Sequence, residues 1–107
     1  MADRAPNCPV EQALGIIGGK WKGIILYHLM TGKKRFGELR KHMPSVTQRM
    51  LTKQLRELEN DGLIHREVYK VVPPKVEYSL TPMAEPVKPI IVALKEWGST
   101  LPNPDMS

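Results

Sequence analysis

A glycine pair at 18–19 followed by Lys20 is the first stretch whose residue types could do chemistry, because glycine-rich loops that end in lysine can wrap a phosphate. A P-loop needs a glycine, four further residues, then Gly-Lys and a hydroxyl residue, between a strand and a helix. Here Leu14 replaces the first glycine, Trp21 replaces the hydroxyl residue, and a helical pattern precedes the pair. We therefore interpret the glycines as a corner between two helices that leaves Lys20 and Lys22 free to reach solvent or a phosphate.

The single cysteine, Cys8, is the second candidate for chemistry. It stands just before Pro9, at the predicted start of a helix, where free amide groups and the helix dipole favour a thiolate, although Glu11 opposes this effect. Cys8 could sense oxidants or electrophiles through an adduct, or through a disulfide to another subunit or a small thiol. The alternative is a helix-capping cysteine with no regulatory role.

Other reactive constellations are missing from the sequence. The three histidines, His28, His42 and His65, have no acidic companions spaced as metal ligands, and no nucleophile–base pair or paired carboxylates occur. We therefore predict no catalytic residue, no metal site and no cofactor, and we do not expect an enzyme.

A basic and amide-bearing helical face is the strongest chemical signal. Leu51, Leu55 and Leu58 fall on one stripe of a predicted helix over 47–60, which ends at Asn60-Asp61-Gly62. Arg49, Lys53, Arg56 and Asn60 fall roughly 140° to 200° away, opposite the leucines. Arginine and glutamine can make bidentate contacts to base edges, and lysine contacts phosphate as a point charge. The alternative is a polar face that only meets water.

The elements before this helix form a recognisable series. Pro9 to about Ile17 predicts the first helix, and a dense apolar run, Trp21 to Met30, predicts a mostly buried second helix ending at Gly32. Phe36, Leu39 and Met43 predict a short third helix that Pro44 stops. Either Ser45 or Thr47 could cap the helix that follows. A short helix, a tight turn and a longer helix are the pattern of a helix-turn-helix.

Two β-prone stretches follow, over about 63–70 and 75–80. The connection "VVPP" predicts a stiff projecting loop, flanked by Lys70 and Lys75, with Arg66 nearby on the first strand. A hairpin at this place is a wing, which can set cations along a DNA backbone or minor groove. The fold class is thus mostly α with a small β-hairpin wing (α+β), a winged helix-turn-helix.

Charge supports a polyanion as partner. The net charge of +5 is concentrated in residues 20–42, where seven lysines and arginines, Arg35 among them, face only Glu38. Composition is ordinary for a soluble domain, and 107 residues suffice for one core. We expect a single domain over 1–107, with 1–7 and 102–107 as loose tails. No secretion signal or run near ~20 apolar residues occurs, so we expect a cytoplasmic protein without membrane contact.

The chain resembles the HxlR-type winged helix-turn-helix transcription regulators over residues 8–98. The similar segments are "CPVEQALGIIGGKWKGIIL", "RFGELRKHMPSVTQRMLTKQLRELENDGLI", "VPPKVEYSLT" and "LKEWG". This resemblance implies a cytoplasmic homodimer that binds double-stranded DNA at an inverted-repeat operator. It implies that Thr47, Gln48, Arg49 and Lys53 face the groove and that the wing carries Lys70 and Lys75. The resemblance also links a cysteine at position 8 to oxidant or electrophile sensing in some members.

The last helix bears on assembly. Pro86 and Pro89 predict a late start or a kink, with a regular part from about Pro89 to Ser99. Its broad apolar face exceeds what a small core can cover, and the first helix adds a stripe of its own. A symmetric dimer through these two helices would bury both. The candidate interface residues are Leu14, Ile17, Ile90, Ile91, Leu94 and Trp97.

Two functions therefore remain open on the sequence. The first is a dimeric, sequence-specific DNA-binding transcription regulator that uses helix 47–60 and wing 63–80, with Cys8 as a candidate redox sensor. The second is a winged-helix module for protein–protein contact without specific DNA binding. The basic stretch and the face with Arg49 and Lys53 favour the first, because a protein-binding wing needs neither.

Overall fold

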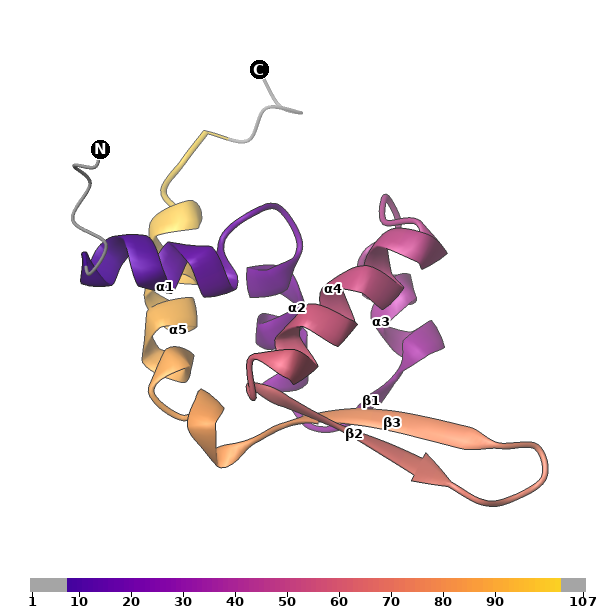
Figure 1. The fold of residues 1–107 in the computed structure, drawn as a ribbon. Helices are drawn as coiled ribbons and strands as arrows, with labels where there is room; N and C mark the ends of the chain where they lie inside the picture. Colours follow the sequence, from indigo (N-terminus) through magenta and orange to yellow (C-terminus); the bar gives the residue numbers. More distant parts are fainter. Residues whose placement is uncertain (1–7, 103–107) are drawn as a thin grey trace.

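The computed structural model describes residues 8–102. Figure 1 shows a bundle of helices with a small sheet that extends to one side as a hairpin. The elements, in chain order, are α1 (Pro9–Ile17), α2 (Lys22–Leu29), β1 (Lys34–Arg35), α3 (Phe36–His42), α4 (Gln48–Asn60), β2 (Ile64–Tyr69), β3 (Lys75–Leu80), the 3-10 turn η1 (Pro82–Ala84) and α5 (Val87–Gly98). This arrangement confirms the winged helix-turn-helix fold. The expected tails lie outside the described residues, except for Pro102.

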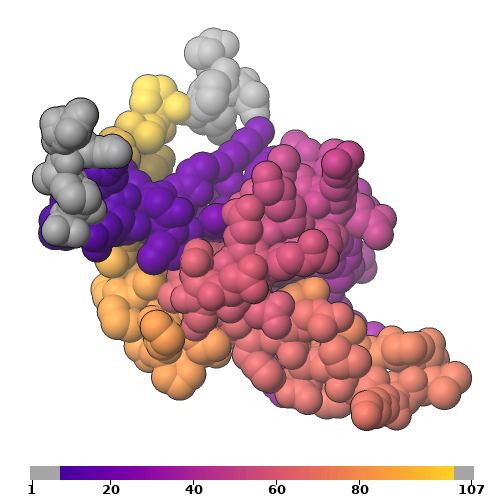
Figure 2. All heavy atoms as spheres, viewed as in Figure 1, coloured from indigo at the N-terminus to yellow at the C-terminus, as the bar shows by residue number. Residues whose placement is uncertain are grey.

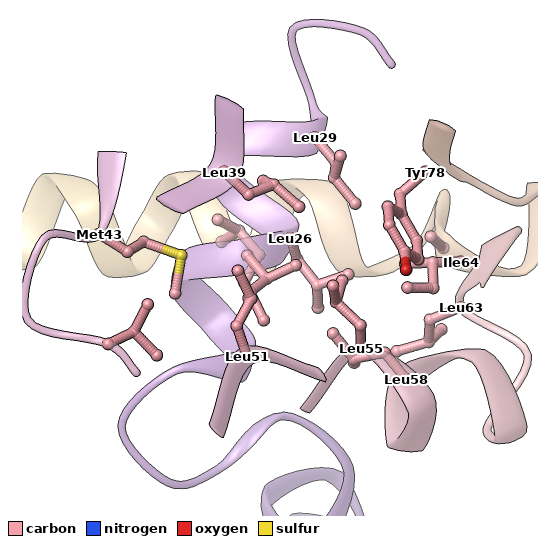
Figure 3. Close-up of a cluster of buried hydrophobic side chains, with 14 residues drawn as sticks. Leu26, Leu29, Leu39, Met43, Leu51, Leu55, Leu58, Leu63, Ile64 and Tyr78 are labelled. Carbon is pink, nitrogen blue, oxygen red and sulfur yellow. The ribbon is translucent and has the colours of Figure 1, made fainter. Parts of the chain in front are cut away.

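The core lies between α2, α3, α4 and the root of the hairpin. Leu51, Leu55 and Leu58 of α4 are buried and point toward Leu26 of α2 (Figure 3). Leu39 enters the same cluster from α3. The predicted leucine stripe is therefore what fixes the orientation of α4, and it leaves the opposite face of that helix to solvent.

The second helix, α2, is buried along most of its apolar run. Ile25, Leu26 and Leu29 are buried, but Ile24 and Tyr27 are 37% and 36% exposed. The helix is mostly buried, as predicted, because α3, α4, α5 and β3 pack against it, and these two are the exposed side chains of its apolar run. Ile24 and Tyr27 line a groove between α2 and α5.

The sheet has the antiparallel order β1-β3-β2. The two longer strands pair from Ile64 with Leu80 to Tyr69 with Lys75, and so confirm the predicted hairpin. The two-residue β1 was not predicted; Lys34 pairs with Tyr78 and so fastens the start of the helix-turn-helix to the hairpin. In Figure 1 the hairpin projects away from the side of the molecule that carries α1 and α5.

Specific contacts fix both ends of α4. Thr47, and not Ser45, is the N-cap. Gly62 follows the helix at φ 84°, a left-handed conformation that glycine adopts without strain. The Thr81 hydroxyl donates a hydrogen bond to the Gly62 carbonyl at 2.6 Å. The end of the hairpin is thereby joined to the end of the helix.

The prolines near the C-terminus delay α5 less than expected. The helix begins at Val87, directly after Pro86, whereas the sequence suggested a start near Pro89. Pro89 is the third helical residue, and the first four N–H groups of a helix have no partner within it. Pro89 therefore removes no hydrogen bond, and the helix runs through it.

Candidate nucleic-acid interface

The solvent face of α4 carries a row of polar side chains. The side chains of Gln48, Arg49, Thr52, Lys53 and Arg56 are exposed and line a shallow groove along the helix. They stand there because the leucines on the other side of α4 are held in the core. Arginine, amide and hydroxyl groups on one exposed helix face are the set that reads base edges and binds phosphates.

The cations of this face are available for a partner. Within residues 8–102, Arg49, Lys53 and Arg56 form no ion pair. The flanking Glu57 is engaged elsewhere: its Oε1 lies 2.7 Å from the Nζ of Lys22 on α2, and the hydrogen bond from Lys22 lowers the pKa of Glu57. Lys22 is therefore not free to reach a phosphate, contrary to the sequence interpretation, because it joins α2 to α4.

A second recess lies between α4 and the hairpin. Arg56 reaches it from α4 and Arg66 from β2, with Thr52, Glu59 and Tyr78 completing its lining. Arg66 was predicted as a DNA contact. Arg56 was placed on the polar face by its helical spacing but was given no role. The two arginines share this recess because α4 packs against β2, and the strand register sets Tyr78 beside Arg66.

The two wing lysines differ in their surroundings. Lys70 is exposed at the end of the hairpin. The Nζ of Lys75 lies 4.5 Å from the centroid of the Tyr69 ring and 4.0 Å from an oxygen of Glu77. Both lysines flank the loop that Figure 2 shows as the far tip of the molecule, where Val72 is fully exposed.

Arg35 and Thr47 occupy capping positions. Arg35 ends β1 and precedes α3; its backbone N–H donates to the Oε1 of Glu38 at 2.7 Å, and its side chain is exposed. Arg35 does not line either of the two grooves described above. The Thr47 side chain is at the entrance of α4, next to Gln48, with its hydroxyl oxygen used as a cap.

Cys8 is the N-cap residue of α1. Its carbonyl accepts a hydrogen bond from the Gln12 N–H at 3.0 Å, while its half-buried thiol makes no capping hydrogen bond. The neighbouring helix α1 has no buried residue. The thiol therefore lies at the edge of a helix that the rest of the described chain covers only in part.

The six candidate interface residues divide between surface and core. Leu14, Ile90, Leu94 and Trp97 are exposed apolar side chains, Trp97 with 63% of its surface in solvent. Ile17 is half-buried against the core. Ile91 is 4% exposed and belongs to the core of its own chain, so its place on the free face was wrongly predicted.

Two of the three histidines, His28 and His42, pack against each other. The rings of His28 and His42 stack with centroids 4.5 Å apart, joining α2 to α3. Partial burial lowers the pKa of His28, and His42 and Lys34 act in the same direction. Over residues 8–102, no group of three or more potential metal ligands gathers, and no helix has the length and apolar character needed to cross a bilayer.

Comparisons with known proteins agree with this geometry. The family model described as HxlR-like helix-turn-helix matches residues 16–106. The uncharacterized HTH-type transcriptional regulator YdeP of Bacillus subtilis is 66% identical over 97 residues, which cover 91% of this chain and 76% of YdeP.

Solved structures give the same result. The redox regulator HypR in its oxidized form superposes with a TM-score of 0.87 at 61% identity, covering 90% of this chain and 99% of that one. HypR in its reduced form gives a TM-score of 0.84 at 62% identity, covering 87% and 92%. This chain belongs to the HxlR-type family of winged helix-turn-helix transcriptional regulators.

Proposed function

We propose that this protein is a homodimeric transcription regulator that binds a two-fold, inverted-repeat DNA operator. In each subunit, α4 enters the major groove, with Gln48 and Arg49 at base edges and Lys53 at a phosphate. Arg35, Arg66, Lys70 and Lys75 contact the backbone or the adjacent minor groove. Thr47 caps the helix at its entrance to the groove.

The observation that carries this proposal is the exposed polar face of α4. Three cations of that face, Arg49, Lys53 and Arg56, have no ion-pair partner within the described chain, although Glu57 and Glu59 lie on the same helix. An interface with an apolar protein surface does not require a row of unpaired cations on one helix face. Binding to DNA does require such cations, because each phosphate that they neutralise releases counterions.

Dimerisation is supported by the apolar side chains left on α1 and α5. Leu14 projects from one helix and Trp97 from the other, and both are exposed. We infer that a second copy covers this surface and that the dimer presents both α4 helices to the same DNA. Half-sites on straight DNA are spaced about 34 Å apart, which sets the separation such a dimer must reach.

Cys8 is proposed as the sensor that controls this dimer. Two observations support it: Cys8 is the N-cap residue of α1, a helix of the proposed interface, and HypR, a redox regulator, is 61% identical to this chain. Oxidation to a disulfide with a second subunit or with a small thiol, or alkylation by an electrophile, would alter the packing of α1. The recognition helices would then no longer match the spacing of the operator.

The test of DNA binding is a titration of the full chain with selected genomic DNA at several salt concentrations. We expect the logarithm of the binding constant to fall with the logarithm of salt by about 0.9 per phosphate contacted. Several contacts per subunit predict a steep slope. A slope near zero, or no binding at low salt, would favour the alternative of a protein–protein interaction module.

A further inference from the structure

The recess between α4 and the hairpin lies where the two elements proposed to bind DNA meet. Its volume is about 300 Å³, and Thr52 and Arg56 line both this recess and the groove along α4. Arg66 and Tyr78 line it from the hairpin, where the register pairs them across β2 and β3. The major and minor grooves of DNA are separated by a phosphate backbone. A backbone that runs between a helix in one groove and a hairpin in the next therefore passes this recess.

Tyr78 contributes a hydroxyl group without a partner. The side chain is 9% exposed, and its ring belongs to the core, next to Ile64 (Figure 3). Within residues 8–102 the hydroxyl forms no hydrogen bond, yet no fully buried side-chain oxygen or nitrogen there lacks a partner. The Tyr78 oxygen therefore reaches the surface, and the recess is the surface that Tyr78 lines. A largely buried tyrosine hydroxyl normally finds a partner, so this one is available as a donor to a ligand.

The charges of the recess suit one phosphodiester group. Arg56 and Arg66 are exposed, and within residues 8–102 neither forms an ion pair. Glu59 is the third charged residue of the lining, so two positive charges and one negative charge leave an excess of one positive charge. A backbone phosphate of DNA carries one negative charge, which balances this excess, whereas free phosphate near neutral pH carries more. Arginine is also the side chain that binds phosphate oxygens through paired N–H groups.

We propose that this recess binds one backbone phosphate of the operator through Arg56, Arg66 and the Tyr78 hydroxyl. The inference rests on the proposed function. It adds DNA contacts for Arg56 and Tyr78, which had none, and a single phosphate that both arginines share. One donor comes from α4 and two come from the hairpin, so the bound phosphate fixes the wing relative to the recognition helix. The contact reads no base, because phosphates carry no sequence information directly.

The first test is a titration of the full chain with a selected operator at several salt concentrations. Arg56→Gln and Arg66→Gln should each weaken binding by about tenfold for each half-site, the usual effect of a lost hydrogen bond to a charged group. The double variant should lower the salt slope by about 0.9 per bound subunit, because both arginines serve one phosphate. The control Lys88→Gln removes a cation of α5 outside the recess and should retain the wild-type affinity and slope.

The second test separates the hydroxyl from the charges. Tyr78→Phe should weaken operator binding by about tenfold for each half-site and leave the salt slope unchanged, because no charge is removed. The midpoint of urea unfolding should not move, since the hydroxyl has no partner within residues 8–102. Glu59→Gln should strengthen operator binding by about twofold to fivefold, the size of an exposed charge interaction. Unchanged or weaker binding in Glu59→Gln would place the phosphate outside the recess.

The outcomes distinguish this inference from the proposed function. If wild type does not bind DNA, both are overturned. If wild type binds with a steep salt slope but Arg56→Gln or Tyr78→Phe binds equally well, the proposed function stands and the shared phosphate is overturned. A slope loss of about 1.8 per subunit in the double variant overturns it as well, since the arginines would then contact separate phosphates.

A final arm of the experiment tests free phosphate as the occupant. Inorganic phosphate is titrated into the protein without DNA by calorimetry at constant ionic strength, and no saturable binding is expected. The inference is overturned in favour of a free-anion site if wild type binds inorganic phosphate, the double variant does not, and both bind the operator alike.

Discussion

The hydroxyl oxygen of Thr47 accepts a hydrogen bond from the backbone N–H of Met50 at 3.0 Å, and this contact begins the helix proposed to enter DNA. The sequence left two possible caps, Ser45 and Thr47, because each precedes the apolar stripe at a suitable spacing. The structure selects Thr47, whose extended backbone directs its side chain to the third residue of the helix. Ser45 is exposed in the preceding turn.

Thr47→Ala should therefore lower the free energy of unfolding by about 0.5–2 kcal/mol, the usual loss on removing an N-cap hydroxyl. The matched variant Ser45→Ala removes the same kind of group two residues earlier and should change stability by less than about 0.5 kcal/mol. Urea unfolding followed by circular dichroism measures both. Equal losses in the two variants would contradict the assignment of the cap.

Sequence patterns predicted the parts of this fold that depend on local spacing. Leu51, Leu55 and Leu58 recur at helical intervals, and each of them is buried. That single pattern also placed Arg49 and Lys53 on the exposed side. Local spacing was sufficient here because a helix with one apolar stripe has only one orientation against a core.

The remainder depends on contacts between distant residues. Two residues are too few to show a strand pattern, so β1 was missed; it exists because Lys34 pairs with Tyr78. The ion pair of Lys22 with Glu57 likewise forms only because α2 crosses α4. The groove beside α5 has the same origin: no pattern in the sequence predicts which side chains of α2 the later helix leaves uncovered.

Arg49→Ala should weaken binding to a selected operator by about 1–3 kcal/mol and relax the preference for the base it contacts. The side chain is exposed, so the substitution should leave folding intact. Fluorescence anisotropy at fixed salt measures the affinity, and Lys88→Ala, which removes a cation on α5, is the control. If Arg49→Ala binds the operator as tightly as wild type, the assignment of α4 to the major groove is wrong.

Trp97→Ser should shift the protein from dimer to monomer. Trp97 is 63% exposed in a single chain, and a buried interface tryptophan commonly contributes about 2 kcal/mol or more. We therefore expect the dimer dissociation constant to rise by about thirtyfold or more in sedimentation equilibrium. Met83→Ser removes a side chain that is 67% exposed outside α1 and α5, and should leave the dimer unchanged. An unaltered dimer in the Trp97 variant would refute this interface.

Diamide should weaken operator binding of the wild-type protein and leave Cys8→Ser unaffected. Cys8 is the only thiol in the sequence, so any thiol-dependent effect must pass through it. A reducing agent added afterwards should restore binding, since a disulfide is reversible. Electrophoresis without reductant will distinguish a disulfide between two subunits from one with a small thiol. Equal inhibition of wild type and Cys8→Ser would exclude Cys8 as the sensor.

His28 should make the protein less stable as the solution becomes acidic. Partial burial lowers the pKa of His28 from its ordinary value of 6.5, and the neighbouring His42 and Lys34 lower it further. Well above pH 6.5 the ring is neutral in both the folded and the unfolded chain, so it adds no pH dependence there. Below that pH the unfolded chain takes up a proton that the folded chain resists, and the free energy of unfolding falls as pH falls.

Urea unfolding at a series of pH values between 7 and 5 can isolate this contribution. His28→Asn removes the titrating ring, so the decline in stability toward pH 5 should be less steep than in wild type. One proton limits the difference to at most about 1.4 kcal/mol per pH unit. Lys20→Gln, which removes an exposed cation from the turn after α1, is the control and should retain the wild-type slope. A slope in His28→Asn as steep as in wild type would assign the acid sensitivity to other groups.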